Sequence, residues 1–241
     1  MTTDADALKQ EAAERAAAYL TDGMVIGLGT GSTTDFFLRA VGARARAGLR
    51  ISGVPTSTRS EGRARELGIP LTTLDANPRL ALAVDGADEV VLASFDAVKG
   101  RGGALLREKL VALAADLFIV IIDESKLAAH IGEHGAIPVE VVPFAWQSTA
   151  ARLAALGAAW RLRGATADDP PGAAQHAFVT DGGAFILDCQ WPAIPDPAAL
   201  AAAIKGVTGV VDHGLFIGLA GRVIVAGAAG VQVYERPSPG G

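Results

Sequence analysis

The chain has one cysteine, few aromatic residues and no long apolar run. With Cys189 alone, an intrachain disulfide is impossible, and a reducing, cytoplasmic location is expected. The most apolar stretch, residues 117–122, is far shorter than the roughly 20 residues that span a bilayer, so it predicts a buried strand and no membrane partner. The first residues lack the basic and apolar regions of a secretory signal, so none is expected.

Concentrated positive charge is also missing. The chain contains 21 Lys and Arg against 26 Asp and Glu, a formal net charge of −5, and the basic residues are scattered. This pattern excludes the basic face with which proteins bind phosphodiester backbones. Nucleic acid is therefore not an expected partner.

A metal site is not predicted either. His130 and His134 have the i, i+4 spacing of helical ligands, but Gly132 and Gly135 weaken a helix there. No third ligand follows at a suitable spacing, whereas a zinc site needs at least three protein ligands.

Apolar residues make up half of the chain, enough for a large core. Strands are expected at residues 24–29, 51–54, 71–74, 80–84 and 117–122, with helices between several of them. One helix is expected over residues 7–20, and another that Ser32 or Thr33 caps and Gly42 ends. Buried strands alternating with helices predict an α/β fold with a doubly wound, mainly parallel sheet.

The pattern changes near residue 131. A strand at 139–142, a helix at 144–157, a hairpin turn at Asp181-Gly182-Gly183, a helix at 197–205 and a strand at 207–211 are expected. We therefore predict a smaller inserted α+β, ferredoxin-like domain at residues 132–206. Residues 1–131 and 207–241 would form the main catalytic domain.

A glycine-rich turn, residues 29–33, follows the first expected strand. Successive backbone amides and the positive end of a following helix bind anions, and the turn adds three hydroxyls. A dinucleotide motif from Gly27 would need glycine at Ser32, and a P-loop would need a lysine next, so neither motif is met. A plain strand-to-helix turn remains an alternative.

Acidic residues follow the strand expected at 80–84. Asp85 and Asp88 can lie at the rim of the sheet, where substrates bind and where two close carboxylates suit proton transfer. A turn or helix-cap role for both is the open alternative. Lys99 precedes another glycine turn and can neutralise an enediolate or a phosphate.

Glu108 is the candidate general base. Its neighbours three and four positions away on the expected helix are all apolar, so none can form a salt bridge with it: Ala104, Leu105, Val111 and Ala112. A carboxylate on an apolar stripe is desolvated, which raises its pKa toward that of a useful base. Arg107 and Lys109 keep a surface position open as the alternative.

Five segments together resemble the type A ribose-5-phosphate isomerases. They occur in the family's order and cover most of the chain: Gly29-Thr30-Gly31-Ser32-Thr33, Asp85-Gly86-Ala87-Asp88-Glu89, the segment from Lys99 to Lys109, Asp123-Glu124-Ser125-Lys126 and Pro138-Val139-Glu140-Val141. The resemblance implies cofactor-free interconversion of ribose 5-phosphate and ribulose 5-phosphate in the pentose phosphate pathway. It also implies a homodimer or homotetramer.

The resemblance assigns roles to individual residues. Glu108 would move a proton between C1 and C2 through an enediol, and Asp85, Asp88 and Lys99 would aid ring opening and stabilise charge. The expected substrate-binding residues are Lys9, Thr30, Gly31, Ser32, Thr33, Asp85, Gly86, Ala87, Asp88, Lys99, Gly100, Arg101, Gly102 and Lys126.

Two segments depart from the family pattern. Arg101 stands where glycine is frequent, and the hairpin at residues 180–184 lacks the frequent asparagines. Two other functions stay open from the residues alone. A sugar-phosphate sensor could use the same cleft, although no DNA-binding unit is visible, and a transferase could use Glu108 as a nucleophile on thioesters.

Overall fold

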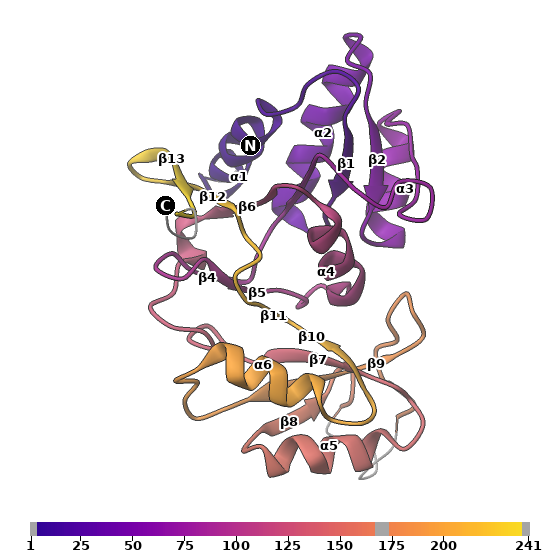
Figure 1. The fold of residues 1–241 in the computed structure, drawn as a ribbon, viewed down its shortest axis with the longest axis vertical. Helices are drawn as coiled ribbons and strands as arrows, with labels where there is room; N and C mark the ends of the chain where they lie inside the picture. Colours follow the sequence, from indigo (N-terminus) through magenta and orange to yellow (C-terminus); the bar gives the residue numbers. More distant parts are fainter. Residues whose placement is uncertain (1–3, 167–173, 238–241) are drawn as a thin grey trace.

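The computed structural model describes residues 4–166 and 174–237, and a mainly parallel sheet forms its centre (Figure 1). All neighbouring strands are parallel except β12 and β13, which form an antiparallel hairpin at one edge. The strand order is β13 (Gly230–Glu235), β12 (Arg222–Gly227), β6 (Phe118–Asp123), β3 (Leu82–Asp85), β1 (Val25–Leu28) and β2 (Ser52–Pro55).

Both faces of this sheet are covered, as predicted for a doubly wound fold. Three helices cover one face, and Ile119 and Ile121 of β6 pack into the core beneath them. Val120 and Ile122 pack into the core on the other face. The three helices are α1 (Asp4–Ala17), α2 (Ser32–Arg46) and α3 (Thr58–Glu66). The other face meets α4 (Leu105–Ala114) and a second, small sheet.

The small sheet is antiparallel and was not predicted. Its order is β11 (Leu215–Phe216), β5 (Asp96–Val98) and β4 (Glu89–Val91). Strands of two or three residues are too short to show a period-two pattern, and their pairing joins segments more than 100 residues apart. The β4–β5 hairpin returns the chain to the end of β3, which brings Lys99 back to Asp85.

The third sheet belongs to a ferredoxin-like unit. Its elements follow the order β7 (Ile137–Val141), α5 (Trp146–Ala155), β8 (Ala159–Leu162), β9 (Phe185–Gln190), α6 (Pro197–Lys205) and β10 (Val210–His213). The strands are antiparallel in the order β10-β7-β9-β8, the βαββαβ arrangement of the predicted ferredoxin-like unit, although β8 was not among the predicted strands. Strand β10 follows residue 206, so the sheet of the smaller unit extends past the predicted end of the inserted domain. The exact division of the chain into domains stays a prediction.

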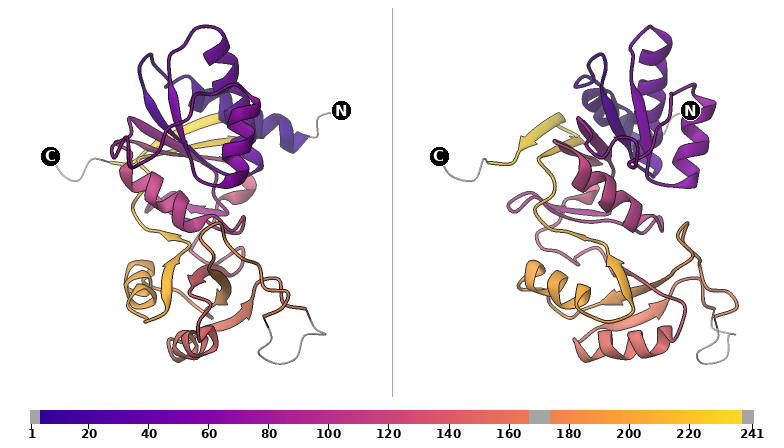
Figure 2. Two further views of the ribbon diagram at one scale, coloured as in Figure 1. Left: turned by 90° about the vertical axis from the view of Figure 1, so that its right-hand side faces the viewer. Right: turned by 45° about the vertical axis from the view of Figure 1, so that its right-hand side comes forward.

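The smaller unit forms its own layer. In both views of Figure 2 it lies below the parallel sheet, with α4 between the two. Helix α4 contacts β3 of the parallel sheet as well as β7 and β10 of the smaller unit. The helix that carries Glu108 is thus packed against both parts of the molecule.

Three local predictions are wrong. Leu71 forms an isolated bridge with Gly53 in place of a strand, and the Thr73 hydroxyl then accepts a hydrogen bond from the Ala76 amide as the chain turns. Gly42 lies inside α2, where a Cβ atom would stand 2.9 Å from the Leu67 carbonyl oxygen, so it permits close packing rather than ending the helix.

The third wrong prediction concerns the N-cap residue of α2. Gly31, with φ of 132°, occupies the N-cap position and makes no side-chain capping bond, whereas Ser32 or Thr33 was expected there. The hydroxyls of Ser32 and Thr33 are therefore not used to cap the helix.

Candidate active site

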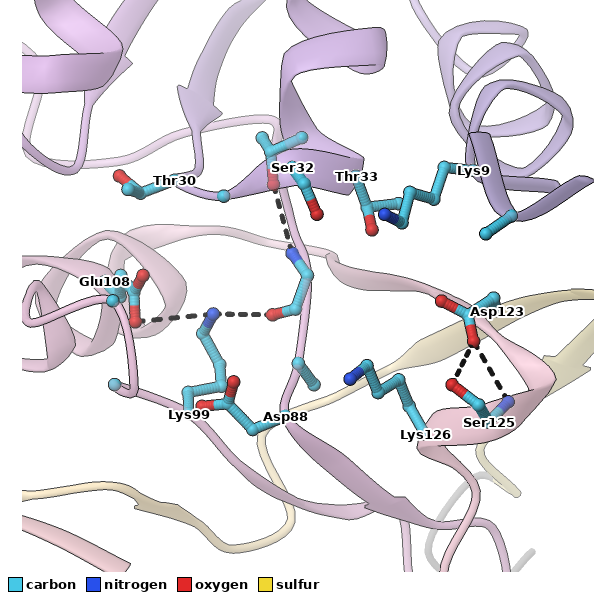
Figure 3. A pocket seen from close by; sticks show the side chains of 17 residues that line it. Lys9, Thr30, Ser32, Thr33, Asp88, Lys99, Glu108, Asp123, Ser125 and Lys126 are labelled. Carbon is cyan, nitrogen blue, oxygen red and sulfur yellow. Dashed lines mark hydrogen bonds and ion pairs between the residues drawn. The ribbon is translucent and has the colours of Figure 1, made fainter. Parts of the chain in front are cut away.

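Loops at the carboxyl ends of β1, β3 and β6 enclose a cavity of ≈ 370 Å³ (Figure 3). Ligands bind at this edge in open α/β sheets, particularly where neighbouring strands connect in opposite directions, as β1 and β3 do here. The structure brings most of the predicted site residues to this cavity: Lys9, Thr30, Gly31, Ser32, Thr33, Gly86, Ala87, Asp88, Lys99, Gly100, Gly102, Glu108 and Lys126.

Three buried charges meet at one end of the cavity. The Lys99 Nζ atom lies 2.9 Å from Asp85 Oδ2 and 3.4 Å from Glu108 Oε2, and it donates to the Gly86 carbonyl oxygen at 2.6 Å. The side chains of Lys99, Asp85 and Glu108 are 3%, 4% and 4% exposed. One ammonium thus lies between two carboxyl groups in a place that water barely reaches.

Asp85 is held rigidly by the turn after β1. Its Oδ1 atom accepts hydrogen bonds from the Thr30 amide at 3.0 Å, the Gly86 amide at 2.8 Å and the Thr34 hydroxyl at 3.2 Å. At Gly29 a Cβ atom would stand 2.2 Å from this same oxygen, so only glycine allows the close approach. The glycine-rich turn therefore orients the acid as well as lining the cavity.

Glu108 lies in the first turn of α4 and is buried. Burial raises its pKa to about 8, with Asp85 and Asp88 adding to the increase and Lys99 opposing it. The prediction that its apolar helical neighbours would desolvate it is confirmed. The Lys99 ammonium lies 3.4 Å from its Oε2 atom, and the Glu108 side chain lines the cavity.

Lys99 keeps its proton despite its burial. Desolvation alone would lower its pKa, but the charges of Asp85 and Glu108 outweigh that effect and raise the pKa. The ring of Phe216 lies 5.5 Å from its Nζ atom. Its backbone amide donates to the Gly214 carbonyl oxygen at 2.9 Å, which fixes the start of the loop.

Asp88 is half-buried and tied to the same loop. Its Oδ2 atom accepts a hydrogen bond from the Arg101 amide at 3.0 Å, and its own amide donates to the Val98 carbonyl oxygen at 2.8 Å. The Arg101 guanidinium pairs with the buried Glu89 at 2.9 Å and lines a separate hollow. Arg101 therefore contributes a backbone contact here, and its side chain serves the fold.

The other end of the cavity is open and basic. Figure 3 shows the Nζ atoms of Lys9 and Lys126 directed toward the same region as the Thr33 hydroxyl. Lys9 comes from α1, Ser32 and Thr33 begin α2, and Lys126 ends the short helix η1 (Glu124–Lys126) after β6. Two ammonium groups, two hydroxyls and a helix N-terminus form a suitable anion site.

Three polar residues of the cavity were missing from the predicted site list: Thr34, Asp123 and Ser125. The Asp123 Oδ1 atom accepts hydrogen bonds from both the amide and the hydroxyl of Ser125. Asp123 follows the apolar strand at 118–122 just as Asp85 follows Val84. Applying the strand-end argument to both strands would have identified it.

The remaining reactive side chains lie elsewhere. Cys189 is buried in the core of the smaller unit, where desolvation raises its pKa to about 12. Residues 4–166 and 174–237 contain no group of three His, Cys, Asp or Glu placed to hold a metal ion. In the same ranges no helix combines the length and apolar character needed to cross a bilayer.

Known proteins share both the sequence and this fold. The family model of ribose 5-phosphate isomerase A (phosphoriboisomerase A) matches residues 52–230. The ribose-5-phosphate isomerase A of Gloeobacter violaceus is 50% identical over 95% of this chain and 96% of its own length, and that of a Synechococcus is 51% identical over 96% and 98%.

Solved structures agree with these relatives. Ribose 5-phosphate isomerase A from Methanocaldococcus jannaschii has a TM-score of 0.88 at 37% identity, covering 96% of this chain and 99% of that one. A D-ribose-5-phosphate isomerase in complex with phospho-erythronic acid has a TM-score of 0.90 at 37% identity, covering 97% and 100%. This chain belongs to the ribose 5-phosphate isomerase A family.

Proposed function

We propose that Glu108 is the general base with which this chain, a ribose-5-phosphate isomerase of the pentose phosphate pathway, interconverts ribose 5-phosphate and ribulose 5-phosphate. The observation that carries the proposal is a buried carboxylate in the cavity with a pKa raised to about 8. A base of this pKa can take a proton from carbon and return it near neutral pH.

The proposed reaction moves one proton between C1 and C2. Glu108 removes the proton from C2 of the open-chain aldose, and the electrons form an enediolate with its charge on O1. A proton then moves from the C2 hydroxyl to O1, and the same carboxyl group returns its proton to C1, which leaves the ketone at C2. Lys99 stays charged in this range and stabilises the developing oxyanion in a site of low dielectric. Positive charge is thereby supplied by a side chain, so the proposal needs no cofactor.

Ring opening precedes this step. We assign Asp85 and Asp88 to proton transfer on the sugar hydroxyls, because both carboxylates lie at the end of β3 beside Lys99. Asp85 is the more constrained of the two, with three donors on one oxygen. Asp88 is half-buried and lines the cavity, which suits direct contact with the sugar.

The phosphate is assigned to the open, basic end. Lys9 and Lys126 supply charge, while Ser32, Thr33 and the start of α2 supply hydroxyl and amide donors. A related isomerase binds phospho-erythronic acid, a phosphorylated sugar acid. Holding the phosphate there places the sugar carbons toward Glu108 and Lys99 at the other end.

Glu108→Gln tests the base. The amide has nearly the same shape but cannot accept the proton, so kcat should fall about 10²–10⁴-fold in a coupled assay with ribose 5-phosphate. Circular dichroism and binding of a non-reactive phosphosugar should stay close to those of the parent. Near-normal turnover by this variant would overturn the assignment.

Two measurements on the parent protein separate the alternatives. A passive sugar-phosphate sensor would show no turnover in the parent protein, and a thioester transferase would accumulate acyl-Glu108, detectable by mass spectrometry after incubation with an acyl-CoA. A buried base paired with a charged lysine favours turnover over passive binding.

We further propose that the protein acts in the cytoplasm as a homodimer or homotetramer. The lone, buried Cys189 suits a reducing compartment. Large apolar side chains remain exposed on the single chain, including Phe144 at 89% and Leu113 at 60%, which suits burial against another copy. Light scattering coupled to gel filtration measures the assembly, and a monomer at micromolar concentration would contradict it.

A further inference from the structure

Arg163 connects the ferredoxin-like unit to the loop after Lys99. It follows β8, and its amide donates to the Ile186 carbonyl oxygen at 2.9 Å while its own carbonyl accepts from the Phe178 amide at 2.8 Å. Its guanidinium pairs with Asp188 of β9, with Nε 3.1 Å from Oδ2 and Nη2 bonded to Oδ1. Both ends of the side chain are therefore fixed to the smaller unit's sheet.

The third nitrogen of this guanidinium reaches the active-site loop. Arg163 Nη1 donates to two consecutive carbonyl oxygens, those of Gly100 at 2.9 Å and Arg101 at 3.1 Å. In a planar trans peptide the N–H points opposite to the C=O. The N–H of Arg101 accordingly faces Asp88 Oδ2, at 3.0 Å, and the N–H of Gly102 points away from the Arg163 guanidinium; Gly102 itself lines the cavity.

Within the loop, the Gly103 amide donates to the Gly100 carbonyl oxygen at 3.0 Å, and the Arg101 side chain pairs with Glu89 outside it. Gly100 and Gly103 adopt φ of +100° and +85°, and a Cβ atom at Gly100 would stand 2.6 Å from that of Leu105. Glycine makes the path possible but restricts it least, so external contacts must select this conformation. Arg163 supplies two such contacts from outside, and Asp88 supplies one from inside.

We infer that Arg163, locked by Asp188, is a positioning residue for the isomerisation: it orients the peptide groups of residues 100–102 and thereby places Lys99 and Asp88. The inference rests on the proposed roles of those two residues. It assigns the smaller unit a part in catalysis, although none of that unit's described residues lines the cavity.

Arg163→Lys is the test. Lysine keeps the charge and can still pair with Asp188, but one ammonium cannot bind the carboxylate and both carbonyl groups in this geometry. We expect kcat to fall about 10–100-fold with a smaller change in KM, because a displacement of about 1 Å at catalytic groups has effects of that size. The melting temperature should change little.

A second readout is specific to positioning. Glu108 is faced by Lys99, Asp85 and Asp88, and the charge of Lys99 lowers its pKa. If the loop loosens and Lys99 moves away, the acid limb of the kcat/KM profile should move to higher pH in Arg163→Lys. A purely structural role would lower the melting temperature and leave that limb unmoved.

Arg161→Lys is the matched control. Arg161 lies on β8, two residues before Arg163 and in register with Asp188 of β9, and lines the same outer hollow as Arg163 with an exposed side chain. Its kcat and pH profile should equal those of the parent within about twofold. An equal loss in Arg161→Lys, or full kcat in Arg163→Lys, would overturn the inference.

If Arg163→Lys does not fold, Asp188→Asn is used as the test variant. Asparagine keeps the size and one acceptor, so a reduced kcat with a shifted acid limb supports the inference, and full kcat contradicts it. Failure of the proposed function would look different, as full turnover by Glu108→Gln. The Arg163 inference fails on its own when Glu108→Gln is inactive while Arg163→Lys and Asp188→Asn are both fully active.

Discussion

The two ends of the cavity hold their charges in opposite ways. At the buried end, Lys99 lies between Asp85 and Glu108, and each of these side chains is at most 4% exposed. At the open end, Lys9 and Lys126 line the cavity; the Lys9 side chain is 20% exposed, and its Nζ atom lies 3.8 Å from Asp6 Oδ1. The buried end holds its charges in close pairs away from water, whereas the open end has them where a ligand can reach them.

The difference follows from what each end must do. A base needs a shifted pKa, which requires removal of water and a fixed set of neighbouring charges. A phosphate carries its charge already, so its site needs only donors and positive charge that a small ligand can reach. Burial would add a desolvation cost there without improving binding. Three experiments probe this contrast, from the largest expected effect to the smallest.

Lys99→Met should have the largest effect. It leaves two buried carboxylates without their cation, so the pKa of Glu108 rises further and the base is protonated at neutral pH. We expect kcat to fall about 10²–10³-fold, with the midpoint of the acid limb moved to higher pH.

Lys109→Met is the control for Lys99→Met. Lys109 also lies over Phe216, at 5.0 Å, but it pairs with Asp212 of β10 at 2.6 Å instead of the catalytic carboxylates. Breaking that pair should lower the melting temperature and leave kcat within about threefold. Equal kcat losses in the two variants would show that general destabilisation, and not the charge of Lys99, explains the effect.

As the pH rises, kcat/KM should increase while the free energy of unfolding decreases. The pKa of Glu108 is raised from 4.5 to about 8 in the folded protein, so the unfolded chain releases this proton first. The stability that the protonated carboxyl contributes is present below about pH 4.5 and is lost, by a few kcal/mol, as the pH rises through about 8. Over the same range kcat/KM should rise as the base ionises.

Urea unfolding and steady-state kinetics from pH 5 to pH 9 measure both curves. In Glu108→Gln the difference in unfolding free energy across this range should shrink by the contribution of that carboxyl. An unchanged pH slope in this variant would show that Glu108 is not the residue that titrates.

Lys126→Ala should have the smallest effect and should act on binding. It removes one charged donor of the open end, worth about 1.5–2 kcal/mol, so KM should rise roughly tenfold with kcat within about twofold. Raising the ionic strength should weaken substrate binding in the parent and change the variant less, since exposed charges are screened. A large loss of kcat would show that Lys126 belongs to the chemical end.

Much of the fold was predictable because its signals are local. The strands at residues 25–28, 82–85 and 118–123 are short apolar segments next to polar, glycine-containing turns, and their carboxyl ends form the rim of the cavity. The small sheet was not predictable, because β11 meets β5 only after more than 100 intervening residues. Its strands are stabilised by that pairing and have no pattern of their own.

In the active site, too, the features that were predictable depend on residues close together in the sequence. The apolar neighbours of Glu108 on its own helix are a property of the sequence, and they indicated a desolvated carboxylate without any family comparison. Asp123 was omitted although it follows a strand in the same way as Asp85. The turn of Arg101 toward Glu89 depends on a buried carboxylate that no local pattern reveals.

The sequence by itself determined the alternation of strands and helices, the glycine turn beside Asp85 and the apolar stripe around Glu108, since each depends on residues a few positions apart. Only the tertiary structure decided that Lys99 lies between Asp85 and Glu108, that Lys9 and Lys126 share one end of the cavity, and that Arg163 holds the loop after Lys99. These contacts join distant segments, and they form only when three sheets pack together and exclude water.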